Sequence, residues 1–534
     1  MKLVRNRYKG VVFFGEPGSG KSTAANLLSK KIENSKLLEA SLVLKYALCL
    51  NRLPKTKEQF ITDADDSYKN DFIDREKARK IFLELTRKYS KTIVAESMNA
   101  IVDRKYSDRF VIIAGARALD AAKYYKLHNF LVVYLECKNC DLVERLKGRN
   151  KSDRGAREEI KHEDDIYQTK KIKKVADLVL DSSELVSESI AREILKYLQE
   201  KQVVECKRCI NSNLNPAVSF DKKGHCNICQ FYLENFDVKA LGKEFEEFLK
   251  MKNRNEKYDV MVGISGGKDS TAILYTALEL GFRPLAFTFD SGYYPGHTFG
   301  RAKEVAKKFS VDYQMINIQP YIRDLDRKCY GEMAEMYDEP ESLELRQRFL
   351  NLYQEGRKHY SIKCKHMMPF VRTCQLCRRT VIRAYYAEAL RNKVRVVILG
   401  VNEWAGLSGA ELGSGKISAI RKLKPYKNKP AVYVVHLPFL LQRTIEDTKK
   451  ILKNIGWEEP KGEDLVESNS NSCLIALAAE TKAKNMLGFH PDTTRLAREV
   501  TVGFLTKDEA KRALKKIHTS KHSVRDVLKK ARLI

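Results

Sequence analysis

The sequence lacks an apolar run of the length that a membrane-spanning helix requires, which is about 18 residues. It also lacks internal repeats and low-complexity segments. The first nine residues are basic and lead directly into an apolar strand pattern, unlike the charged start and apolar centre of a signal peptide. We therefore expect a cytoplasmic protein that does not associate with membranes.

Acidic residues are scarce relative to basic ones, 69 Asp and Glu against 98 Lys and Arg, and the formal net charge is +29. A surface with this balance attracts polyanions in a salt-dependent way. Residues 416–429 hold six cations and no acid, and residues 507–534 hold ten cations and three acids. Arg421, Lys422 and Lys424 in the first cluster are candidate contacts to a polyanionic partner. A solvated lysine loop is the alternative interpretation.

We do not expect the twelve cysteines to form disulfide bonds, because thiols stay reduced in the cytoplasm. Pairs at CxxC spacing indicate metal or redox chemistry instead. Cys206 and Cys209 are followed, after sixteen intervening residues, by Cys226 and Cys229. Four thiolates in two such pairs give tetrahedral Zn²⁺ ligation, and the metal replaces a core that a segment of about 30 residues cannot form. A closed site of this kind has a structural role because it leaves no open coordination position.

Residues 258–271, YDVMVGISGGKDST, read as a buried strand, a glycine loop and the start of a helix. The two glycines let backbone amides face phosphate oxygens, and the helix offers the same anion its unpaired N–H groups and the positive end of its dipole. A second strand pattern ends at Asp290 and a third at Gly400, before Asn402 and Glu403. We expect a nucleotide to lie across these strand ends.

The segment SGGKDS, residues 265–270, resembles the PP-loop of ATP pyrophosphatases, enzymes that cut ATP between its α and β phosphates. The resemblance implies that pyrophosphate sits in the loop and that AMP is left on a substrate oxygen, which a sulfur or nitrogen nucleophile then replaces. Lys268 would neutralise charge on the pyrophosphate, and Asp269 would place Mg²⁺ or Lys268. The other candidate ATP-binding residues in this part of the chain are Ser265, Gly266, Gly267, Ser270, Asp290 and Gly400.

Residues 9–28 read as a strand, a glycine loop and a helix, and residues 15–22 match the pattern GxxxxGKS. In such a P-loop the backbone amides cradle the β-phosphate, Lys21 reaches the β and γ oxygens, and Ser22 ligates Mg²⁺. An empty, decayed loop is the alternative. The candidate nucleotide-binding residues here are Gly15, Gly18, Gly20, Lys21, Ser22 and Thr23.

About the first 200 residues resemble small nucleotide kinases and dephospho-CoA kinases. The resemblance implies lid arginines that close over a transferring phosphoryl group, for which Arg145, Arg149 and Arg154 are the candidates, and Arg149 is assigned to nucleotide binding. It departs from the family in one respect, because no Walker B aspartate follows the strand that ends at Gly115. A regulatory nucleotide sensor is therefore an alternative to an active kinase.

Residues 206–229 resemble the zinc ribbon that precedes PP-loop amidotransferases acting on N-acetylated nucleotide sugars. Residues 494–516 resemble the closing helices of the same enzymes. Within them, Thr506 and Glu509 form a predicted capping box, so a well-capped helix is the simplest interpretation of that segment.

A third cysteine pair, Cys374 and Cys377, stands at the start of a predicted helix and directly before Arg378 and Arg379, an electropositive place that stabilises thiolates. This helix resembles the CxxC helix of the 2-thiouridine and 2-thiocytidine tRNA thiolases. In those enzymes two such cysteines and one further cysteine hold a [4Fe-4S] cluster whose open iron carries sulfur. The resemblance implies catalytic and cluster-binding roles for Cys374, Cys377 and Cys473.

Three other interpretations of these thiols stay open: a redox pair that carries a persulfide, a second zinc site that includes Cys364, and buried inert thiols. Arg378 and Arg379 are further candidate contacts to nucleic acid, which the thiolase resemblance implies is tRNA. The charged and aromatic segment 323–368 is either a substrate loop or a solvated helical insertion.

These motifs together predict an α/β protein with two doubly wound parallel-sheet domains, the first P-loop kinase-like and the second PP-loop or HUP-like, joined by a small four-cysteine zinc ribbon. The predicted boundaries are 1–202 for the first domain, 203–235 for the ribbon, 236–435 for the second domain and 436–534 for a basic helical C-terminal region.

Three functions agree with the sequence. The first is a tRNA-modifying sulfurtransferase that uses ATP, Mg²⁺, Zn²⁺ and a [4Fe-4S] cluster with a separate sulfur donor, as the CxxC helix and the basic clusters indicate. The second is a PP-loop amidotransferase that uses ammonia from a donor to modify an N-acetyl nucleotide sugar or a related small molecule, as the ribbon and the C-terminal helices indicate. The third is a non-catalytic nucleotide-sensing adaptor, which the missing Walker B aspartate favours.

Overall fold

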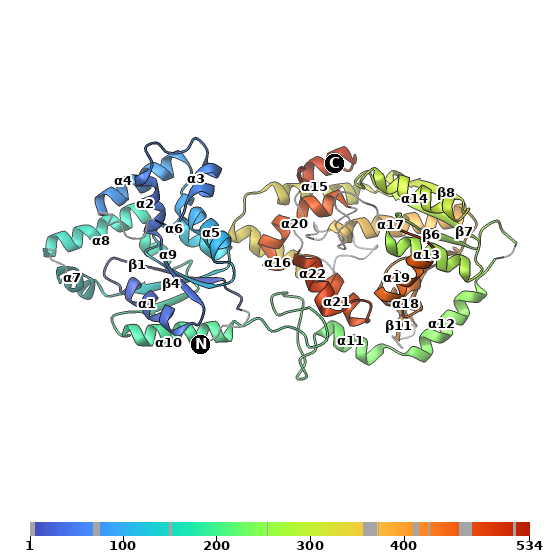
Figure 1. Cartoon of the computed structure of the whole chain (residues 1–534), viewed down its shortest axis with the longest axis horizontal. Coiled ribbons are helices and arrows are strands. Elements are labelled where there is room, and N and C mark those ends of the chain that lie inside the picture. The colour runs from blue at the N-terminus through green and yellow to red at the C-terminus, as the bar shows by residue number, and fades with distance from the viewer. Residues whose placement is uncertain are drawn as a thin grey trace. The chain divides into compact units, whose positions relative to one another are not determined.

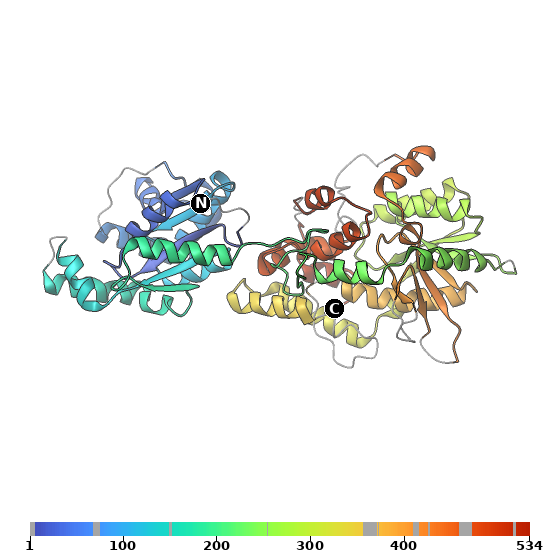
Figure 2. The same cartoon turned by 90° about the horizontal axis from the view of Figure 1, so that it is seen from below.

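The structure is a computed structural model that describes residues 6–67, 75–148, 152–253, 255–355, 371, 373–408, 416–424, 428–458, 473–515 and 520–534. It divides into two compact units, Met1–Val203 with Ser342–Glu344 and Val204–Glu341 with Leu345–Ile534. Figures 1 and 2 show that a sheet with helices on its faces forms the centre of each unit. No helix in the described part of the chain is both long and apolar enough to cross a membrane.

A five-stranded sheet in the order β2-β3-β1-β4-β5, parallel throughout, forms the first unit. Because successive side chains of a strand face opposite ways, Val12 and Phe14 of β1 enter one core cluster and Val11 and Phe13 enter the other. Helices α2, α5 and α6 cover the first face, and α1 and α10 cover the second. The elements of this unit are β1 (Gly10–Gly15), α1 (Lys21–Lys31), β2 (Ser35–Glu39), α2 (Ser41–Cys49), α3 (Lys57–Asp63), α4 (Arg75–Lys88), α5 (Ile93–Lys105), β3 (Phe110–Ala114), α6 (Leu119–Leu127), β4 (Phe130–Glu136), α7 (Asn139–Lys147), α8 (Asp153–Tyr167), α9 (Thr169–Ile172), β5 (Leu178–Asp181) and α10 (Ser187–Glu200).

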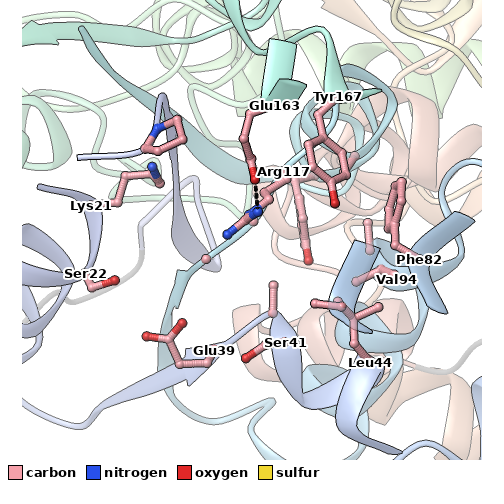
Figure 3. Close-up of a pocket in the computed structure, with 18 of the residues that line it drawn as sticks. Lys21, Ser22, Glu39, Ser41, Leu44, Phe82, Val94, Arg117, Glu163 and Tyr167 are labelled. Carbon is pink, nitrogen blue, oxygen red and sulfur yellow. Dashed lines mark hydrogen bonds and ion pairs between the residues drawn. The ribbon is translucent and has the colours of Figure 1, made fainter. Parts of the chain in front are cut away.

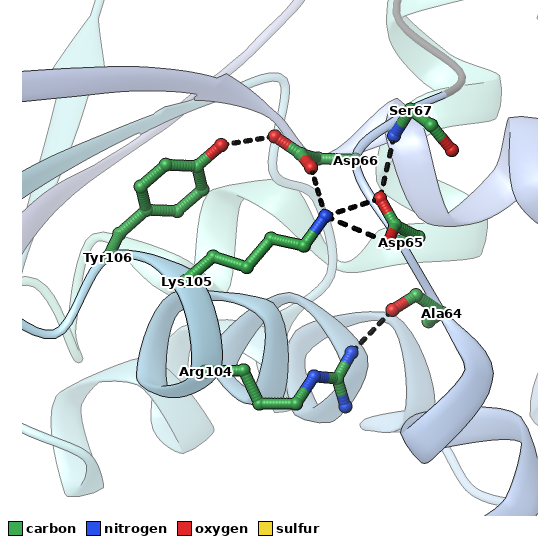
Figure 4. A network of polar contacts seen from close by, with 7 residues as sticks. All are labelled: Ala64, Asp65, Asp66, Ser67, Arg104, Lys105 and Tyr106. Carbon is green, nitrogen blue, oxygen red and sulfur yellow. Dashed lines mark hydrogen bonds and ion pairs between the residues drawn. The ribbon is translucent and has the colours of Figure 1, made fainter.

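The segment after α3 is tied to the end of α5 by a network of polar contacts (Figure 4). Lys105 Nζ donates to Asp65 at 2.7 Å and to Asp66 at 2.8 Å, and the hydroxyl of Tyr106 donates to Asp66. The hydrogen bonds to Asp65 and Asp66 raise the pKa of Lys105 to about 12. This network fixes the end of α5, from which the chain enters β3.

A six-stranded sheet in the order β12-β13-β9-β6-β7-β8 forms the second unit. Its strands are parallel except for the edge strand β12, which pairs antiparallel with β13. The elements up to β9 are α11 (Asn227–Asn235), α12 (Val238–Lys250), β6 (Val260–Gly263), α13 (Lys268–Glu279), β7 (Pro284–Asp290), α14 (His297–Lys308), β8 (Tyr313–Asn317), η1 (Gln319–Tyr321), α15 (Asp324–Asp338), α16 (Leu343–Glu355), α17 (Thr373–Arg391) and β9 (Val396–Leu399). The remaining elements are β10 (Gly406–Ser408), β11 (Lys416–Ser418), β12 (Ile420–Leu423), β13 (Val432–His436), α18 (Leu437–Leu440), α19 (Ile445–Asn454), α20 (Leu474–Leu487), α21 (Thr493–Thr501), α22 (Lys507–Lys515) and α23 (Val524–Lys530).

The chain order of this sheet places the PP-loop segment at a topological switch point. From β6 the chain builds outward through β7 to β8, and then returns to the other side of β6 to form β9. A crevice at the carboxyl ends of the strands is expected where the winding reverses in this way. The predicted fold class, two doubly wound α/β units, is confirmed.

The segment predicted to form a zinc ribbon and the C-terminal helices belong to the same compact unit as the second sheet. The predicted capping box of α22 is present, since Thr506 N donates to Glu509 Oε2 at 2.9 Å and Glu509 N donates to Thr506 Oγ1 at 3.2 Å. Helix α15 is not a solvated insertion, because Cys329 and Met333 on it are fully buried.

A buried ion cluster joins α15 to α17. Asp326 is fully buried, its carboxylate accepts a hydrogen bond from Arg383, and Arg379 Nε lies 3.8 Å from Asp326 Oδ1. The backbone N–H of Arg323 also donates to Asp326, at 2.9 Å. Since a buried cation without its partner is costly, this carboxylate holds α17 in place.

We expect Asp326→Ala to lower the free energy of unfolding of the second unit by about 3–5 kcal/mol, because it leaves the buried guanidinium of Arg379 and the half-buried one of Arg383 without their anion. Both tryptophans of the chain, Trp404 and Trp457, lie in this unit, so tryptophan fluorescence during urea unfolding reports on it. Asp324→Ala, an exposed aspartate on the same helix, is the control. Equal loss of stability in the two variants contradicts the role given to Asp326.

Candidate active sites

The glycine loop of the second unit connects β6 to α13, whose first residue is Lys268. Gly266 has a φ of +75°, and a Cβ built on it lies 2.4 Å from the Cβ of Arg301. Both the backbone angle and the lack of space require glycine at this position.

Two serines brace this loop from within. Ser270 Oγ donates to Gly267 O at 3.0 Å and accepts from Ser265 N at 3.1 Å. Ser265 Oγ lies 3.2 Å from the same hydroxyl. The loop therefore has a defined shape that places the N-terminus of α13 where an anion can bind.

The carboxyl ends of β7 and β9 flank the loop, on the two sides of β6. A Cβ on Gly400 lies 3.5 Å from the carbonyl carbon of Asp269, so the chain leaving β9 contacts the first turn of α13. On the other side, Thr288 Oγ1 of β7 donates to Ile264 O at 2.5 Å, and Asp290 ends the strand. The expected meeting of the three strand ends is present.

Helix α21 adds charged side chains to this edge that the sequence analysis did not assign. Arg498 Nη1 donates to both carboxylate oxygens of Glu403, at 2.9 and 3.2 Å. Arg495 Nη1 donates to Glu499 Oε1 at 2.6 Å. The sequence feature that could have indicated them is the spacing of Arg495, Arg498 and Glu499, which places the three side chains on one face of a helix.

Glu499 is a buried carboxyl group close to the PP-loop segment. Burial raises its pKa to about 7; Arg495 opposes this rise, and the charges of Asp269 and Glu403 add to it. Arg443 is a second buried group nearby, since it donates to Thr276 Oγ1 of α13 at 2.6 Å. Burial lowers the pKa of Arg443, while Asp447 and Asp269 oppose the shift.

Cys473, at the start of α20, comes back to the cysteine pair of α17. Burial raises the pKa of Cys473, and the Cys374 and Cys377 thiols contribute to that rise, so the three thiols are close enough to interact. The backbone N–H of Leu474 donates to Tyr293 O at 3.0 Å, which attaches the start of α20 to the loop after β7. Cys473 therefore lies within electrostatic reach of the pair on α17, near a strand end of the second sheet, and Cys374 is exposed.

The expected electropositive setting of the cysteine pair is not found. Burial raises the pKa of Cys377 to about 12, which favours the thiol rather than the thiolate. Arg379 is only 2% exposed and lies beside Asp326, and Arg378 lies 3.9 Å from Glu403. The burial of Arg379 also disagrees with its expected contact to nucleic acid, because tertiary packing directs this side chain into the ion cluster.

The basic residues of the edge strand are placed differently. Arg421 is half-buried and pairs with Val434 in the β12–β13 ladder, whereas Lys422 and Lys424 are exposed. Tyr426 and Lys427 of the same basic run lie outside the described residues.

The four ribbon cysteines form a closed, buried group. In the described part of the chain, the ligand atoms of Cys206, Cys209, Cys226 and Cys229 all lie within 4.8 Å of one another. Cys226 N donates to Cys206 Sγ at 3.2 Å, and Asn211 N donates to Cys209 Sγ at 3.5 Å. Such N–H donors stabilise metal-bound sulfur, so this group can bind a metal ion such as zinc.

The glycine loop of the first unit follows β1. Gly15, Gly18 and Gly20 have φ values of +143°, +87° and +85°, which favour glycine. Lys21 Nζ donates to Gly15 O at 2.8 Å and to Glu16 O at 2.7 Å, so its ammonium group lies over the loop. Ser22 and Thr23 follow Lys21 in the first turn of α1 and are exposed.

A cavity of about 260 Å³ adjoins this loop (Figure 3). Its wall combines apolar and aromatic side chains, among them Leu44, Phe82 and Tyr167, with an ion pair between Arg117 and Glu163. The rings of Phe82 and Tyr167 meet edge to face at 4.9 Å. The cavity is therefore suited to a small acceptor molecule beside the phosphates of a nucleotide.

Glu39 ends β2 at the edge of this cavity (Figure 3). A Cβ on Gly115, which follows β3, lies 2.8 Å from Glu39 Oε2. Burial raises the pKa of Glu39, and Lys45 opposes the shift. A carboxylate from the neighbouring strand β2 thus lies where an acid following β3 was expected. The sequence pattern could not indicate this, because the two strands are far apart in the chain.

The predicted lid arginines have separate positions. Arg145 Nη2 donates to Ser182 O at 2.7 Å, and its Nη1 lies 3.4 Å from Gly18 O in the P-loop. Arg154 pairs with Glu158 on the exposed side of α8. Arg149 lies outside the described residues.

Family models match both units: the model described as an AAA domain matches residues 11–168, and the model described as NAD synthase matches residues 241–363. This chain joins a P-loop kinase-like domain to a PP-loop domain. An uncharacterized protein of Methanocaldococcus jannaschii is 24% identical to the chain over 319 residues, which cover 59% of this chain and 94% of that protein.

The PP-loop domain is also similar to two enzymes named NH(3)-dependent NAD(+) synthetases. Those of Pyrococcus furiosus and Pyrococcus horikoshii are 33% and 32% identical over 95 residues. The matches cover 16% of this chain and 36% of each enzyme. A solved structure of shikimate kinase from Acinetobacter baumannii in complex with shikimate aligns with 36% of this chain and 93% of its own, with 15% identity and a TM-score of 0.23.

The raised pKa of Glu499 predicts a pH dependence of stability in the PP-loop domain. Since the native state holds a proton that the unfolded chain loses near pH 4.5, the stability contributed by this group is present below pH 4.5 and is lost as the pH rises through 7. In Glu499→Gln this side chain is neutral at every pH. We therefore expect the free energy of unfolding of the variant to fall by up to about 3 kcal/mol less than that of the wild type between pH 5 and pH 8. Urea unfolding followed by tryptophan fluorescence measures it, with the exposed Glu304→Gln as the control; equal pH slopes in all three proteins refute the assignment.

Proposed function

We propose that the PP-loop domain transfers AMP from ATP to an oxygen of its substrate and then replaces that oxygen with sulfur, and that the substrate is a tRNA. One observation carries the sulfur assignment: Cys473 lies within electrostatic reach of Cys374 and Cys377 near the end of β7, which itself flanks the PP-loop. Thiols that could carry sulfur thus lie at the same edge of the sheet as the loop that would bind ATP.

In the first step the substrate oxygen attacks the α-phosphorus of ATP. The bond from the α-phosphorus to the oxygen that bridges to the β-phosphorus breaks, and pyrophosphate leaves with the electron pair. Lys268 and the amides at the start of α13 offset the charge on this leaving group, and Ser265 donates to it. Asp269 positions Mg²⁺ or Lys268.

In the second step a sulfur nucleophile forms a bond to the carbon that carries the AMP. The carbon–oxygen bond breaks, and AMP leaves with the electron pair and the substrate oxygen. Cys374, Cys377 and Cys473 would hold a [4Fe-4S] cluster, which supplies an iron with an open position for sulfur. Three interacting thiols are a suitable donor set, and bound iron would offset the burial that raises the pKa of Cys377.

The charge of the chain supports a polyanionic substrate. Lys422 and Lys424 are exposed at the edge strand β12, and the formal net charge is +29. Phosphate groups of an RNA would bind such a surface with a strong salt dependence.

A second candidate is an amidotransferase that uses ammonia in place of sulfur. The match to NAD synthase and the similarity to two proteins named NH(3)-dependent synthetases favour it. In that case the substrate is a small molecule such as an N-acetyl nucleotide sugar, and the three thiols have no part in the atom transfer.

The P-loop domain is a second site of ATP use in this proposal. It transfers the γ-phosphoryl group to a small acceptor in the cavity beside the loop, and Glu39 takes the place of the acid expected after β3. A nucleotide-sensing adaptor remains the alternative in which neither loop turns over.

The two loops predict two different products from ATP. We expect Lys268→Ala to lower AMP and pyrophosphate formation at least about 100-fold and to leave ADP formation unchanged, because it removes charge stabilisation at the leaving group. Lys21→Ala should lower ADP formation and leave AMP and pyrophosphate formation unchanged. Chromatography of labelled ATP measures both products, and Lys307→Ala, an exposed lysine of α14, is the control. AMP formation by Lys268→Ala at the wild-type rate overturns the proposal.

The substrate class is decided in the same assay. Stimulation of AMP formation by total tRNA, with loss of the stimulation at high salt, supports the sulfurtransferase. Stimulation by nucleotide sugars with ammonium and not by tRNA supports the amidotransferase. Absence of AMP and ADP under all conditions supports the adaptor.

The cysteine cluster gives a further prediction. Protein purified without oxygen should contain iron and sulfide in addition to zinc, and Cys473→Ser should lose the iron and keep the zinc. Elemental analysis and the visible absorption spectrum measure this. A colourless wild-type protein that holds only zinc contradicts the cluster.

A further inference from the structure

Helix α21 contacts the zinc ribbon along one face. Arg208 donates through Nη2 and Nε to Thr501 O, at 2.8 and 3.1 Å. Asn215 Nδ2 donates to Thr494 Oγ1 at 3.2 Å, and Cys229 Sγ lies 3.1 Å from Thr501 Oγ1. The ribbon is therefore bonded directly to α21 through the candidate metal ligand Cys229 and through Arg208 and Asn215, which lie between the first and the last ribbon cysteine.

The same face of α21 supplies the apolar surface that the ribbon lacks. Leu496, Ala497 and Val500 belong to one buried cluster with the four cysteines. Lys507, at the start of α22, donates to Cys206 O at 2.7 Å. The ribbon thus depends on α21 for its packing, and α21 depends on the ribbon for its position.

Charged residues beside this face of α21 connect it to the PP-loop edge. Arg498 holds Glu403 through two contacts, and Glu499 lies within electrostatic reach of Asp269. Because consecutive residues are about 100° apart, Arg498 lies one turn from Thr494, next to the ribbon contacts, whereas Glu499 lies on a different side of the helix. One short helix therefore contacts both the ribbon and the PP-loop edge, with Arg498 between the two.

Trp404 forms a second connection between the same parts. Its ring lies 5.9 Å from the ring of Tyr232, on the helix that begins at the last cysteine pair, and the guanidinium of Arg498 lies 5.8 Å above it. Arg208 in turn lies 5.4 Å over the ring of Tyr232. Trp404 directly follows Glu403, so this stack reaches the chain that leaves β9.

We propose that the zinc ribbon is a positioning module for the PP-loop: through α21 and Trp404 it holds Arg498 on Glu403 and so fixes the chain leaving β9 against the first turn of α13. Metal bound to the four cysteines then favours the form of this edge that binds ATP. Arg498 is a positioning residue that acts through Glu403. The inference rests on the proposed cleavage of ATP to AMP only for its kinetic readout.

The linkage works in both directions because metal binding and folding of the ribbon are coupled. Metal that binds the ordered ribbon stabilises the arrangement of α21 seen here. A variant that weakens the contact between the ribbon and α21 reduces this stabilisation of α21 without altering a metal ligand. Such a variant therefore distinguishes the positioning effect of the ribbon from the effect of the metal itself.

The experiment uses the full chain in a Trp457→Phe, Lys21→Ala background, in which Trp404 is the remaining tryptophan and the P-loop lysine is absent. Arg498→Ala should raise the KM for ATP in AMP formation about tenfold, the equivalent of one hydrogen bond to a charged group, and Arg498→Lys should recover part of this. Arg208→Ala should raise the KM in the same direction with its zinc content unchanged. Arg512→Ala, an exposed arginine of α22, is the control.

Two readouts do not depend on turnover. Removal of zinc by a chelator, and Arg208→Ala with zinc bound, should both shift the Trp404 emission to longer wavelength and speed hydrogen exchange in residues 493–501. Unchanged emission and exchange in both cases overturn the inference, as does an Arg498→Ala protein with the KM of the control. A wild-type protein that forms no AMP contradicts the proposed function alone, and the emission and exchange measurements then decide this inference.

Discussion

The close approach of the chain leaving β9 to the first turn of α13 is the constraint on which the second unit depends. Only 3.5 Å separates the Cβ position of Gly400 from the carbonyl carbon of Asp269, and Gly266 leaves no space for a side chain beside Arg301. Because the backbone is packed this closely, the ends of β6, β7 and β9 form one edge. The cysteines of α17 and α20 and the charged face of α21 lie around that edge.

The two units have similar phosphate-binding loops, but the surroundings of the two loops differ. Each has a glycine loop between a buried parallel strand and a helix N-terminus, with a lysine at the first helical position. The P-loop domain has a cavity beside the loop, whereas the PP-loop domain is completed by elements from the C-terminal part of the chain. The first arrangement suits a small acceptor.

Local patterns predicted the fold and the loops well. The strand, loop and helix at each lysine, the fold class and the capping box of α22 all depend on neighbouring residues, whose periodicity and backbone preferences are visible in the sequence. The predicted electropositive setting of Cys377 was wrong because it depended only on the neighbours of this residue in the sequence. Arg379 pairs with Asp326 instead, a partner more than fifty residues earlier in the chain.

The sequence by itself determined two parallel-sheet units, two phosphate loops and a four-cysteine group, because each is encoded within one short segment by the spacing of glycines, apolar residues or thiols. Tertiary structure alone decided that Cys473 lies within electrostatic reach of the pair on α17, that Glu39 stands beside Gly115, and that Arg498 contacts Glu403. Each of these relations joins residues on separate elements. Its geometry is set by the packing of helices on a sheet, which no local pattern specifies.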